Sequence, residues 1–439
     1  MYRNAIDLVK QNYVDYSTYS MKAKSYPSVY DGLTEVRRRC LVGAYTDAPA
    51  TSMVKVSTMS GYILSYHPHS SDGIAEVIVN MTSEYTCPFP FFDGRGNFGD
   101  LNNPASAPRY LECMLNKTAR KLYFSLYDEA PKENYEVREE PLYLPTLFPA
   151  ALLTSQFLIG NGTPNCLIPG LDYNDLKKFI INYIKTGDKT VSSKNKVRLV
   201  DYDQIAEKDR DKSIQTLLNT GKGAIRYEPT VILKDNTITI TNLYVLANFS
   251  ILMNYLKDDI KADKVDVRDE STAERVWVIE KVKNKVFDME ACAKKVKQMF
   301  TYKENYAMYF HDEEGRVKPY SLGEIIEICY EKYKEAYINK TNKEIADLSL
   351  QKTILECLAR MSEHADVVTN KNISYEEKIK QFKNILDYNE DVIEKAFAKP
   401  LHMFKDDKKA IEKINKSIKD KQEKLKDIGK VIVEDLEKV

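Results

Sequence analysis

The pattern of apolar and polar positions predicts a mostly helical beginning of the chain. Residues 1–20 are polar and rich in tyrosine, which indicates a helix or an arm. From residue 29 to residue 127 the apolar spacing is mostly helical and is broken by Pro and Gly turns. The apolar run 74–81 follows Ser-Ser-Asp, a sequence typical of a helix cap. Residues 141–170 are apolar and proline-rich, so we expect them to be buried and irregular.

Strand patterns dominate the middle of the chain. Alternation of apolar and polar residues, with many β-branched side chains, predicts strands at 197–202, 224–233, 237–244, 264–267 and 275–281. Lys234, Asp235 and Asn236 separate two of these segments, which predicts a hairpin turn. The middle of the chain is therefore expected to be α+β.

Beyond residue 321 the apolar residues return to helical spacing. The last segment repeats an apolar residue every seven positions, at Ile411, Ile418, Leu425 and Ile432. A second row of apolar positions on the same helix is interrupted by polar residues, which favours a helical hairpin partner or a short coiled coil over a long zipper. The fold class predicted for the whole chain is multidomain α+β.

Composition narrows the class of protein. The chain has 439 residues, enough for two to four domains, with 30% charged and 43% apolar residues. Its formal net charge is zero, whereas DNA-binding proteins usually carry a basic excess. The seven cysteines include no Cys-x-x-Cys pair, which argues against zinc and redox motifs. No secretion signal or membrane-length apolar run is present, so we expect a soluble protein in the cytoplasm.

Tyr110 is the candidate nucleophile. A free phenol has a pKa near 10, so a tyrosine nucleophile needs a neighbouring cation, and Arg109 provides a planar donor fork suited to phosphate oxygens. Adjacent residues need not point the same way, and the chain has 30 tyrosines. By counting alone, a structural Tyr110 is the better interpretation.

Three other segments carry candidate chemistry and simpler alternatives. His67 and His69 fit a turn whose following helix could face phosphate, or a zinc pair without an evident third ligand. Gly94, Gly96 and Gly99 form a flexible turn that allows close approach to a ligand and lacks the Walker pattern. The run 37–39 of three arginines is either a DNA contact or a solvated helix face.

Taken in order, these segments resemble the breakage domain of gyrase A and topoisomerase IV. The matching segments are 25–33, 38–39, 66–69, 93–99, 109–110, 144–149, 159–162, 220–223 and 267–271. Because the chain ends soon after its last helices, with no DNA-wrapping domain, it looks closest to the stand-alone medium subunit of T-even-type phage topoisomerases. The resemblance implies a winged-helix-like DNA-cleavage domain with an N-terminal arm (1–140), an α/β tower domain (141–320) and a coiled-coil exit gate with dimerisation helices (321–439).

The resemblance also assigns roles to individual residues. It implies that Tyr110 forms a 5′-phosphotyrosyl link, and that Arg109 and Lys24 assist at the scissile phosphate. The implied DNA-binding residues are Arg38, Arg39, His67, His69 and Ile159, the last as a wedge between base pairs. The chain departs from the family at Lys24 (arginine in the family), Ser70 and Leu158 (both glycine in the family).

The implied activity is that of an ATP-dependent type II topoisomerase. Double-stranded DNA, a second copy of this chain bound through the C-terminal helices, and a large ATPase subunit completing a heterotetramer are the implied partners. Mg²⁺ and ATP are both expected on that large subunit. The alternative is a DNA-binding structural protein that has the same fold and cuts nothing.

Overall fold

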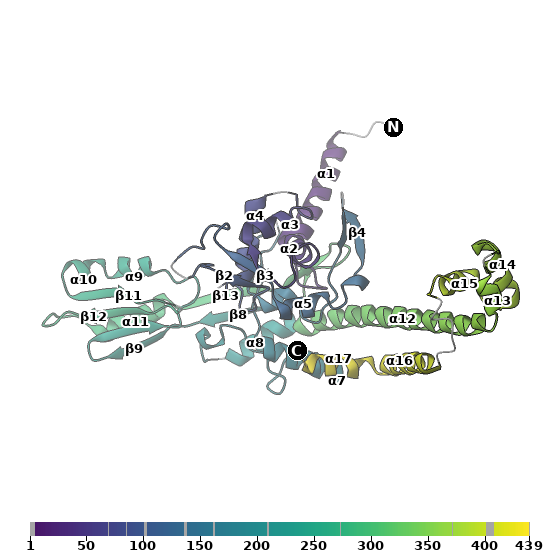
Figure 1. Ribbon diagram of the computed structural model, residues 1–439. Coiled ribbons are helices and arrows are strands. Elements are labelled where there is room, and N and C mark those ends of the chain that lie inside the picture. The colour runs from purple at the N-terminus through teal and green to yellow at the C-terminus, as the bar shows by residue number, and fades with distance from the viewer. Residues whose placement is uncertain are drawn as a thin grey trace. The chain divides into compact units, whose positions relative to one another are not determined.

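The computed structural model describes residues 5–68, 70–84, 86–100, 103–135, 138–160, 163–208, 210–272, 274–370, 372–400 and 408–438. It divides into two compact units, residues 1–333 and 334–439. Both helices and antiparallel sheets are present (Figure 1). The multidomain α+β class is therefore confirmed, while the three-domain division stays a prediction.

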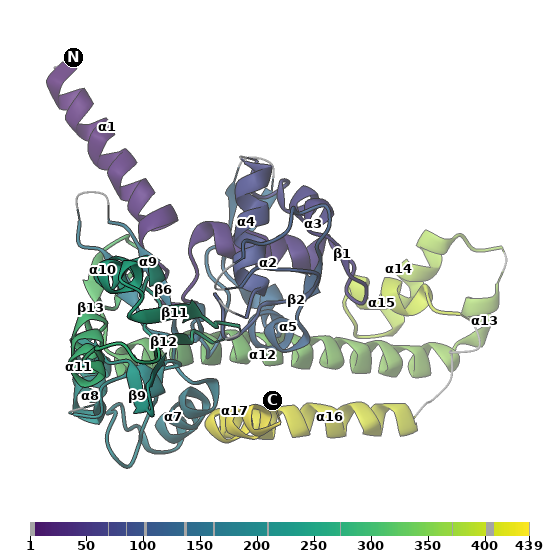
Figure 2. The ribbon, with the colours of Figure 1, turned by 90° about the vertical axis from the view of Figure 1, so that its left-hand side faces the viewer.

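The first unit begins with helices packed around a small sheet. Its elements are α1 (Ala5–Ser20), the π-helical turn η1 (Met21–Ser25), α2 (Glu35–Thr46), β1 (Val54–Lys55), α3 (Val56–Ile63), α4 (Ser71–Thr82), β2 (Phe92–Arg95), β3 (Glu112–Leu115), α5 (Lys117–Phe124), η2 (Tyr127–Glu129), β4 (Lys132–Tyr135) and β5 (Arg138–Pro141). Helices α2, α3 and α4 contact one another (Figure 2). The strands form an antiparallel sheet in the order β1-β3-β2.

The rest of the first unit carries two four-stranded sheets. Its elements are α6 (Ala150–Leu153), β6 (Gln156–Leu158), β7 (Cys166–Ile168), α7 (Tyr173–Thr186), η3 (Tyr202–Gln204), α8 (Arg210–Thr220), β8 (Lys222–Tyr227), β9 (Thr230–Lys234), β10 (Thr237–Thr241), α9 (Phe249–Tyr255), α10 (Lys257–Lys261), β11 (Val265–Asp269), β12 (Trp277–Lys281), α11 (Met289–Met299), β13 (Tyr302–Ala307), β14 (Tyr309–His311) and β15 (Val317–Pro319). The sheet orders are β6-β7-β13-β8 and β11-β12-β10-β9.

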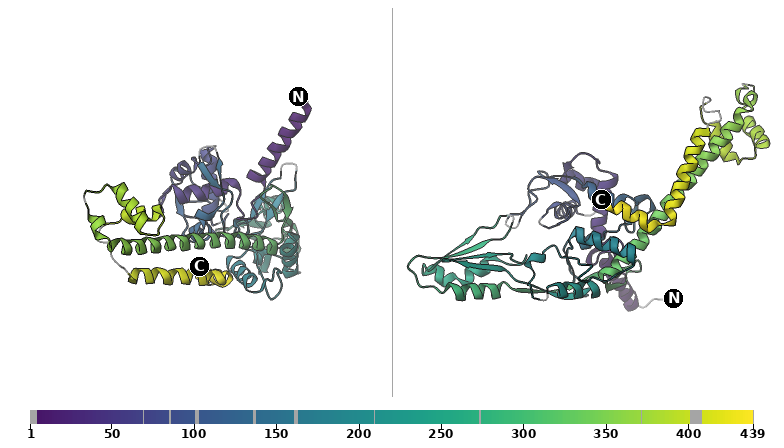
Figure 3. Two further views of the ribbon diagram at one scale, coloured as in Figure 1. Left: turned by 90° about the vertical axis from the view of Figure 1, so that its right-hand side faces the viewer. Right: turned by 90° about the horizontal axis from the view of Figure 1, so that it is seen from below.

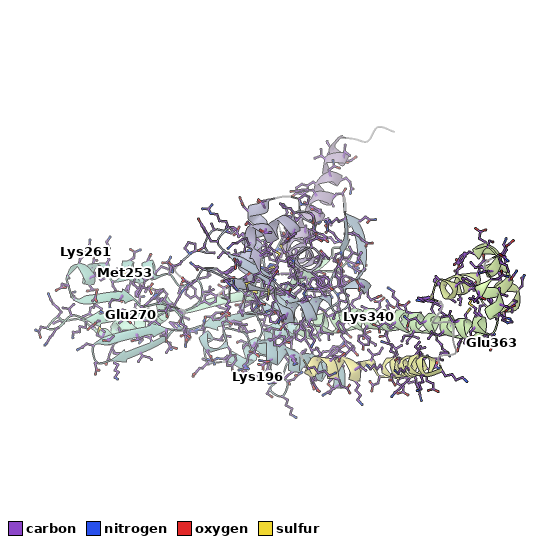
Figure 4. All side chains as sticks on the ribbon, viewed as in Figure 1. Lys196, Met253, Lys261, Glu270, Lys340 and Glu363 are labelled. Atoms are coloured by element: carbon purple, nitrogen blue, oxygen red, sulfur yellow. The ribbon has the colours of Figure 1, made fainter. Side chains whose placement is uncertain are left out.

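The sheet β11-β12-β10-β9 has its own core. Trp277 and Phe300 meet edge to face, and Ile238, Ile240 and Ile279 are fully buried beside them. Met253 on α9 and Lys261 on α10 mark this region in Figure 4. The right-hand view of Figure 3 shows its teal-green strands running side by side.

The second unit is helical. It contains the C-terminal part of α12 (Leu322–Ser362), followed by α13 (Ala365–Thr369), α14 (Tyr375–Ile385), α15 (Glu390–Phe397), α16 (Lys408–Lys426) and α17 (Ile428–Glu437). Lys421 on α16 pairs with Glu344 on α12, and the two helices lie side by side within this unit (Figures 1 and 2). The side chain of Asp427 caps α17, so the segment with an apolar residue every seven positions is divided into two helices, α16 and α17.

Several local predictions are confirmed. Ser70 caps α4, its hydroxyl accepting a hydrogen bond from the Gly73 N–H at 3.0 Å. The expected hairpin joins β9 and β10, with Lys234 paired to Thr237 and a left-handed φ of 52° at Asp235. Both signals were local, so the sequence carried them without tertiary information.

Other strand predictions are wrong. The segment 197–202 forms only an isolated bridge between Leu199 and Leu171 and then a short 3₁₀ turn; its alternation reflects burial of Val197 and Leu199. The helical interpretation of 29–127 missed the sheet β1-β3-β2, and the irregular interpretation of 141–170 missed β6 and β7. These strands are only two to four residues long, which leaves little room for periodicity.

Candidate functional site

Tyr110 lies on an exposed turn just before β3. Its side chain is 63% exposed, and its backbone N–H donates to the Ala107 carbonyl at 2.9 Å. The guanidinium carbon of Arg109 lies 4.8 Å from the centre of the Tyr110 ring, so the two neighbours do face one another. In the described part of the chain, the Tyr110 hydroxyl forms no hydrogen bond. A phenol hydroxyl and a cation are thus presented together to solvent.

The glycine-rich turn packs directly against the Tyr110 segment. Gly96 has a φ of 120°, and a Cβ there would lie 2.9 Å from the Leu111 side chain and 3.6 Å from the Tyr110 carbonyl oxygen. The Asn97 carbonyl accepts from the Ser106 N–H at 2.9 Å. The glycine therefore permits a close approach that fixes the backbone leading to Tyr110.

Two further cations, which were not among the predicted site residues, pair with Glu112, two residues after Tyr110. Glu112, the first residue of β3, pairs with Lys55 at 2.9 Å and with Arg95 at 3.3 Å. The hydrogen bond and charge of Lys55, followed by Arg95, lower the pKa of Glu112. Strand pairing brings these residues together, since both Lys55 and Arg95 lie opposite Glu112 in the sheet. Of these two cations, only Arg95 could have been selected from the sequence, because it falls inside the glycine-rich turn.

Lys24 is exposed on the π-helical turn η1. Its neighbours Ala23 and Ser25 are buried, so the turn is anchored while the Lys24 side chain stays in solvent. Among the described residues, no hydrogen bond or ion pair engages its ammonium group. It is thus available to an anion.

Arg38 is buried in an ion pair. Its guanidinium donates to both carboxylate oxygens of Asp31, at 2.7 and 3.0 Å. Asp31 is fully buried and also accepts from the Leu33 and Leu144 N–H groups at 3.0 Å each. Contact between Arg38 and a DNA phosphate would require this arrangement to open.

Arg39 is buried in a second, separate network. Its Nε donates to Glu140 at 2.7 Å, its Nη2 lies 2.5 Å from Glu35, and its Nη1 lies 3.2 Å from Nδ1 of His67. Burial raises the pKa of the Glu140 carboxyl, against the opposing effect of the Arg39 hydrogen bond. The solvated-face alternative is therefore wrong for Arg38 and Arg39, which are both buried.

The histidine segment joins α3 to α4. Tyr66 is buried and His67 is half-buried, whereas His69 lies outside the described residues. Arg138 stacks over the Tyr66 ring at 4.7 Å and donates to its hydroxyl at 3.1 Å. These contacts anchor the residue that precedes His67.

Ile159 is exposed where β6 ends. Its side chain is 65% exposed, and Phe157, two residues earlier, is 61% exposed. Phe157 lies within β6 and Ile159 one residue beyond its end, so two exposed apolar side chains stand two positions apart. A Cβ at Gly160 would lie 2.4 Å from the Thr163 carbonyl oxygen, which requires glycine in this turn. Phe157 was not among the predicted site residues, although its spacing of two from Ile159 could have indicated it.

The predicted site residues therefore form separate groups within one chain. Arg109 meets Tyr110, Arg39 meets His67, and Arg38 meets neither pair. In the described ranges, no hydrogen bond or ion pair connects Tyr110 or Arg109 with Lys24, Arg38, Arg39 or His67.

Metal and thiol chemistry have no site in the described part of the chain. No group of three His, Cys, Asp or Glu side chains there is arranged to hold a metal ion. All seven cysteines are buried and unpaired, and burial raises the pKa of Cys113, beside Glu112, to about 12. No helix in the described ranges combines the length and apolar character needed to cross a membrane.

Tyr110 and Arg109 thus lie side by side between β2 and β3, next to the glycine turn, and comparison with known proteins gives the family. The family model for the A subunit of DNA gyrase/topoisomerase IV matches residues 24–439. The chain belongs to this family of type II topoisomerase A subunits.

Individual relatives share fewer than 30% identical residues with this chain over the matched segments. The chain is 27% identical over 289 residues to the A subunit of DNA gyrase from Haloquadratum walsbyi, covering 63% of this chain and 33% of the relative. It is 29% identical over 303 residues to the corresponding gyrase subunit of Borrelia hermsii, covering 64% and 37%. For the same subunit of Mycoplasma pneumoniae DNA gyrase the identity is 27% over 294 residues, covering 63% and 35%. The chain thus matches about a third of the length of these curated relatives.

Proposed function

We propose that this chain is the DNA breakage–reunion subunit of an ATP-dependent type II topoisomerase. The observation that carries the proposal is the exposed Tyr110 with Arg109 stacked over its ring, held by the Gly96 turn in a chain of this family. The closer assignment to the medium subunit of T-even-type phage enzymes stays a prediction.

The proposed reaction is a reversible transesterification. The Tyr110 phenol oxygen attacks the phosphorus, the bond to the 3′ oxygen breaks, and a 5′-phosphotyrosyl bond forms. The phenol proton leaves to solvent and the 3′ oxygen takes up a proton. Arg109 would stabilise the charge on the phosphate oxygens. Because one phosphate ester replaces another, the reverse attack reseals the strand without ATP.

Cutting both strands requires two copies of this chain, since each Tyr110 would cut one strand. We assign dimerisation to the helices beyond residue 321, which would also form the exit gate. Residues 1–140 would form a winged-helix cleavage domain and residues 141–320 a tower that supports the cut duplex.

We assign Mg²⁺ and ATP to a separate large subunit. The carboxylates near Tyr110 fit a metal site poorly, because Glu112 is paired with Lys55 and Arg95, and Asp93 accepts from Asn116 at 2.6 Å. Mg²⁺ bound to the large subunit would stabilise charge on the phosphate and the leaving oxygen. ATP hydrolysis there would drive passage of the second duplex.

The test combines the purified chain, its ATPase and metal-binding partner, supercoiled DNA and Mg²⁺, followed by a detergent quench. The wild type should give linear DNA with protein at its 5′ ends, and Tyr110→Phe should give none. Tyr375→Phe is the matched control, because Tyr375 is also exposed, at 51%. It should form adducts at the wild-type level.

The rival function is DNA binding without cleavage. It is favoured by the burial of Arg38 and Arg39 and by Lys24, which lacks the bidentate fork of an arginine. Salt-sensitive DNA binding without adducts, in the wild type and with the cognate partner, would support this rival and reject the proposal.

A further inference from the structure

Arg39 contacts a histidine through an atom that can only donate. A guanidinium group carries five N–H donors and no acceptor, and it stays protonated in proteins. Its Nη1 lies 3.2 Å from Nδ1 of His67. Nδ1 must therefore accept, which leaves the proton of the neutral ring on Nε2.

The position of Arg39 is itself fixed by two carboxylates. Glu140 and Glu35 bind Nε and Nη2, which orients the planar group and directs Nη1 at the ring. The Arg39 side chain is 5% exposed and that of Glu140 is 10% exposed, so water competes little for these contacts. Glu140 lies on β5, whereas Arg39 lies on α2, so the orientation depends on tertiary structure.

We propose that Arg39 and Glu140 are positioning residues that hold His67 in the tautomer protonated on Nε2, so that the ring serves as a hydrogen-bond donor to a DNA phosphate. This rests on the proposed function, and it assigns Arg39 an indirect role in place of the predicted direct contact with the DNA backbone.

A second histidine provides an internal contrast. Nδ1 of His311 lies 2.9 Å from the carbonyl oxygen of Asp312, which can only accept, so His311 carries its proton on Nδ1. Burial lowers the pKa of His311, which keeps its ring neutral. The two histidines should therefore show opposite tautomers in one sample.

The direct test is nitrogen NMR of the full chain labelled with ¹⁵N only at histidine, of which there are five. A His67→Gln variant assigns the His67 signals by difference. We expect an unprotonated Nδ1 and a protonated Nε2 for His67, and the reverse for His311. A protonated Nδ1 on His67 in the wild type would overturn the proposal, without any use of DNA or partner.

Substitutions then test which residue sets the tautomer of His67. Arg39→Lys keeps the charge but has one ammonium nitrogen in place of the separately placed Nε, Nη2 and Nη1, so the His67 signals should shift to a mixture of tautomers. Arg268→Lys is the matched control, because Arg268 also pairs with carboxylates but lies on β11, in another sheet; it should leave the His67 spectrum unchanged. Unchanged His67 signals in folded Arg39→Lys would reject Arg39 as the positioning residue.

The functional arm measures adduct yield with the partner subunit present. A Gln side chain at position 67 can present an N–H near the Nε2 position, whereas the shorter Asn cannot. His67→Gln should thus keep most of the cleavage, and His67→Asn should lose about 10²-fold. Equal loss in both would contradict the donor role. Absence of adducts in the wild type would instead reject the proposed function, leaving the NMR result intact.

Discussion

Two groups of basic residues in the first unit differ in how their charges are used. Arg109 and Lys24 are exposed and, among the described residues, have no carboxylate partner. Arg38 and Arg39 are buried and joined to Asp31, Glu35 and Glu140. The exposed group can meet a phosphate without breaking an ion pair, whereas the buried group stabilises the fold and orients a neighbour. A zero net charge is therefore compatible with a local DNA-binding surface.

The largest expected effect is the loss of stability on removing a carboxylate partner of the buried group. Asp31→Ala removes the carboxylate that binds Arg38 and two backbone N–H groups, leaving all of them buried without a partner. We expect a loss of about 3–5 kcal/mol in the free energy of unfolding, measured by urea denaturation. Asp47→Ala, which breaks the more exposed pair with Arg138, should cost less than about 1 kcal/mol. Equal losses would remove the distinction between the two groups.

The next effect concerns Arg109 in the exposed group. Arg109→Ala should leave stability unchanged but lower the rate of adduct formation by about 10²–10³-fold, because it removes a charged donor at the phosphate. Arg316→Ala, at a similarly exposed arginine, is the control and should cleave normally. A normal rate for Arg109→Ala would mean that its stacking on Tyr110 has no part in the reaction.

A smaller effect is expected for the exposed apolar pair at the end of β6. Phe157→Ala and Ile159→Ala should each weaken DNA bending by about 1.5–3 kcal/mol, the free energy of burying such a side chain. Energy transfer between dyes at the two ends of a duplex would measure it. Val286→Ala, at a 92% exposed side chain, should change nothing. If Phe157→Ala bends DNA normally, Ile159 acts alone.

The smallest effect is expected for Lys24. Lys24→Ala should reduce the slope of log affinity against log salt by about 1, as loss of one phosphate contact does. Lys424→Ala, at an exposed lysine in the second unit, should keep the wild-type slope. An unchanged slope in Lys24→Ala would place Lys24 outside the DNA interface.

The sequence predicted features whose determinants lie close together in the chain. The Ser70 cap and the β9–β10 hairpin depend on residues at most a few positions apart. Adjacency offered Arg109 as a cation beside Tyr110 but left open whether the two side chains face one another, as they do. The glycine run predicted a turn that allows close approach to a ligand; the close approach of Gly96 to the Tyr110 segment was not predicted.

Long-range partners escaped prediction for a physical reason. Arg39 and Glu140 lie 101 positions apart, and no local pattern marks a glutamate as the partner of a buried arginine. From the sequence, the run of three arginines could be either a DNA contact or a solvated helix face. Only the tertiary structure shows that Arg38 pairs with Asp31 and Arg39 with Glu140. Likewise, Lys55 meets Glu112, two residues after Tyr110, only because β1 pairs with β3.

The most direct test of the account identifies the residue joined to DNA. Adducts formed with the partner subunit would be digested with nuclease and protease, and the peptide carrying a nucleotide sequenced by mass spectrometry. We predict a nucleotide attached through its 5′ phosphate to Tyr110. Attachment to any other residue would contradict the account, as would its complete absence from wild-type protein that cleaves DNA.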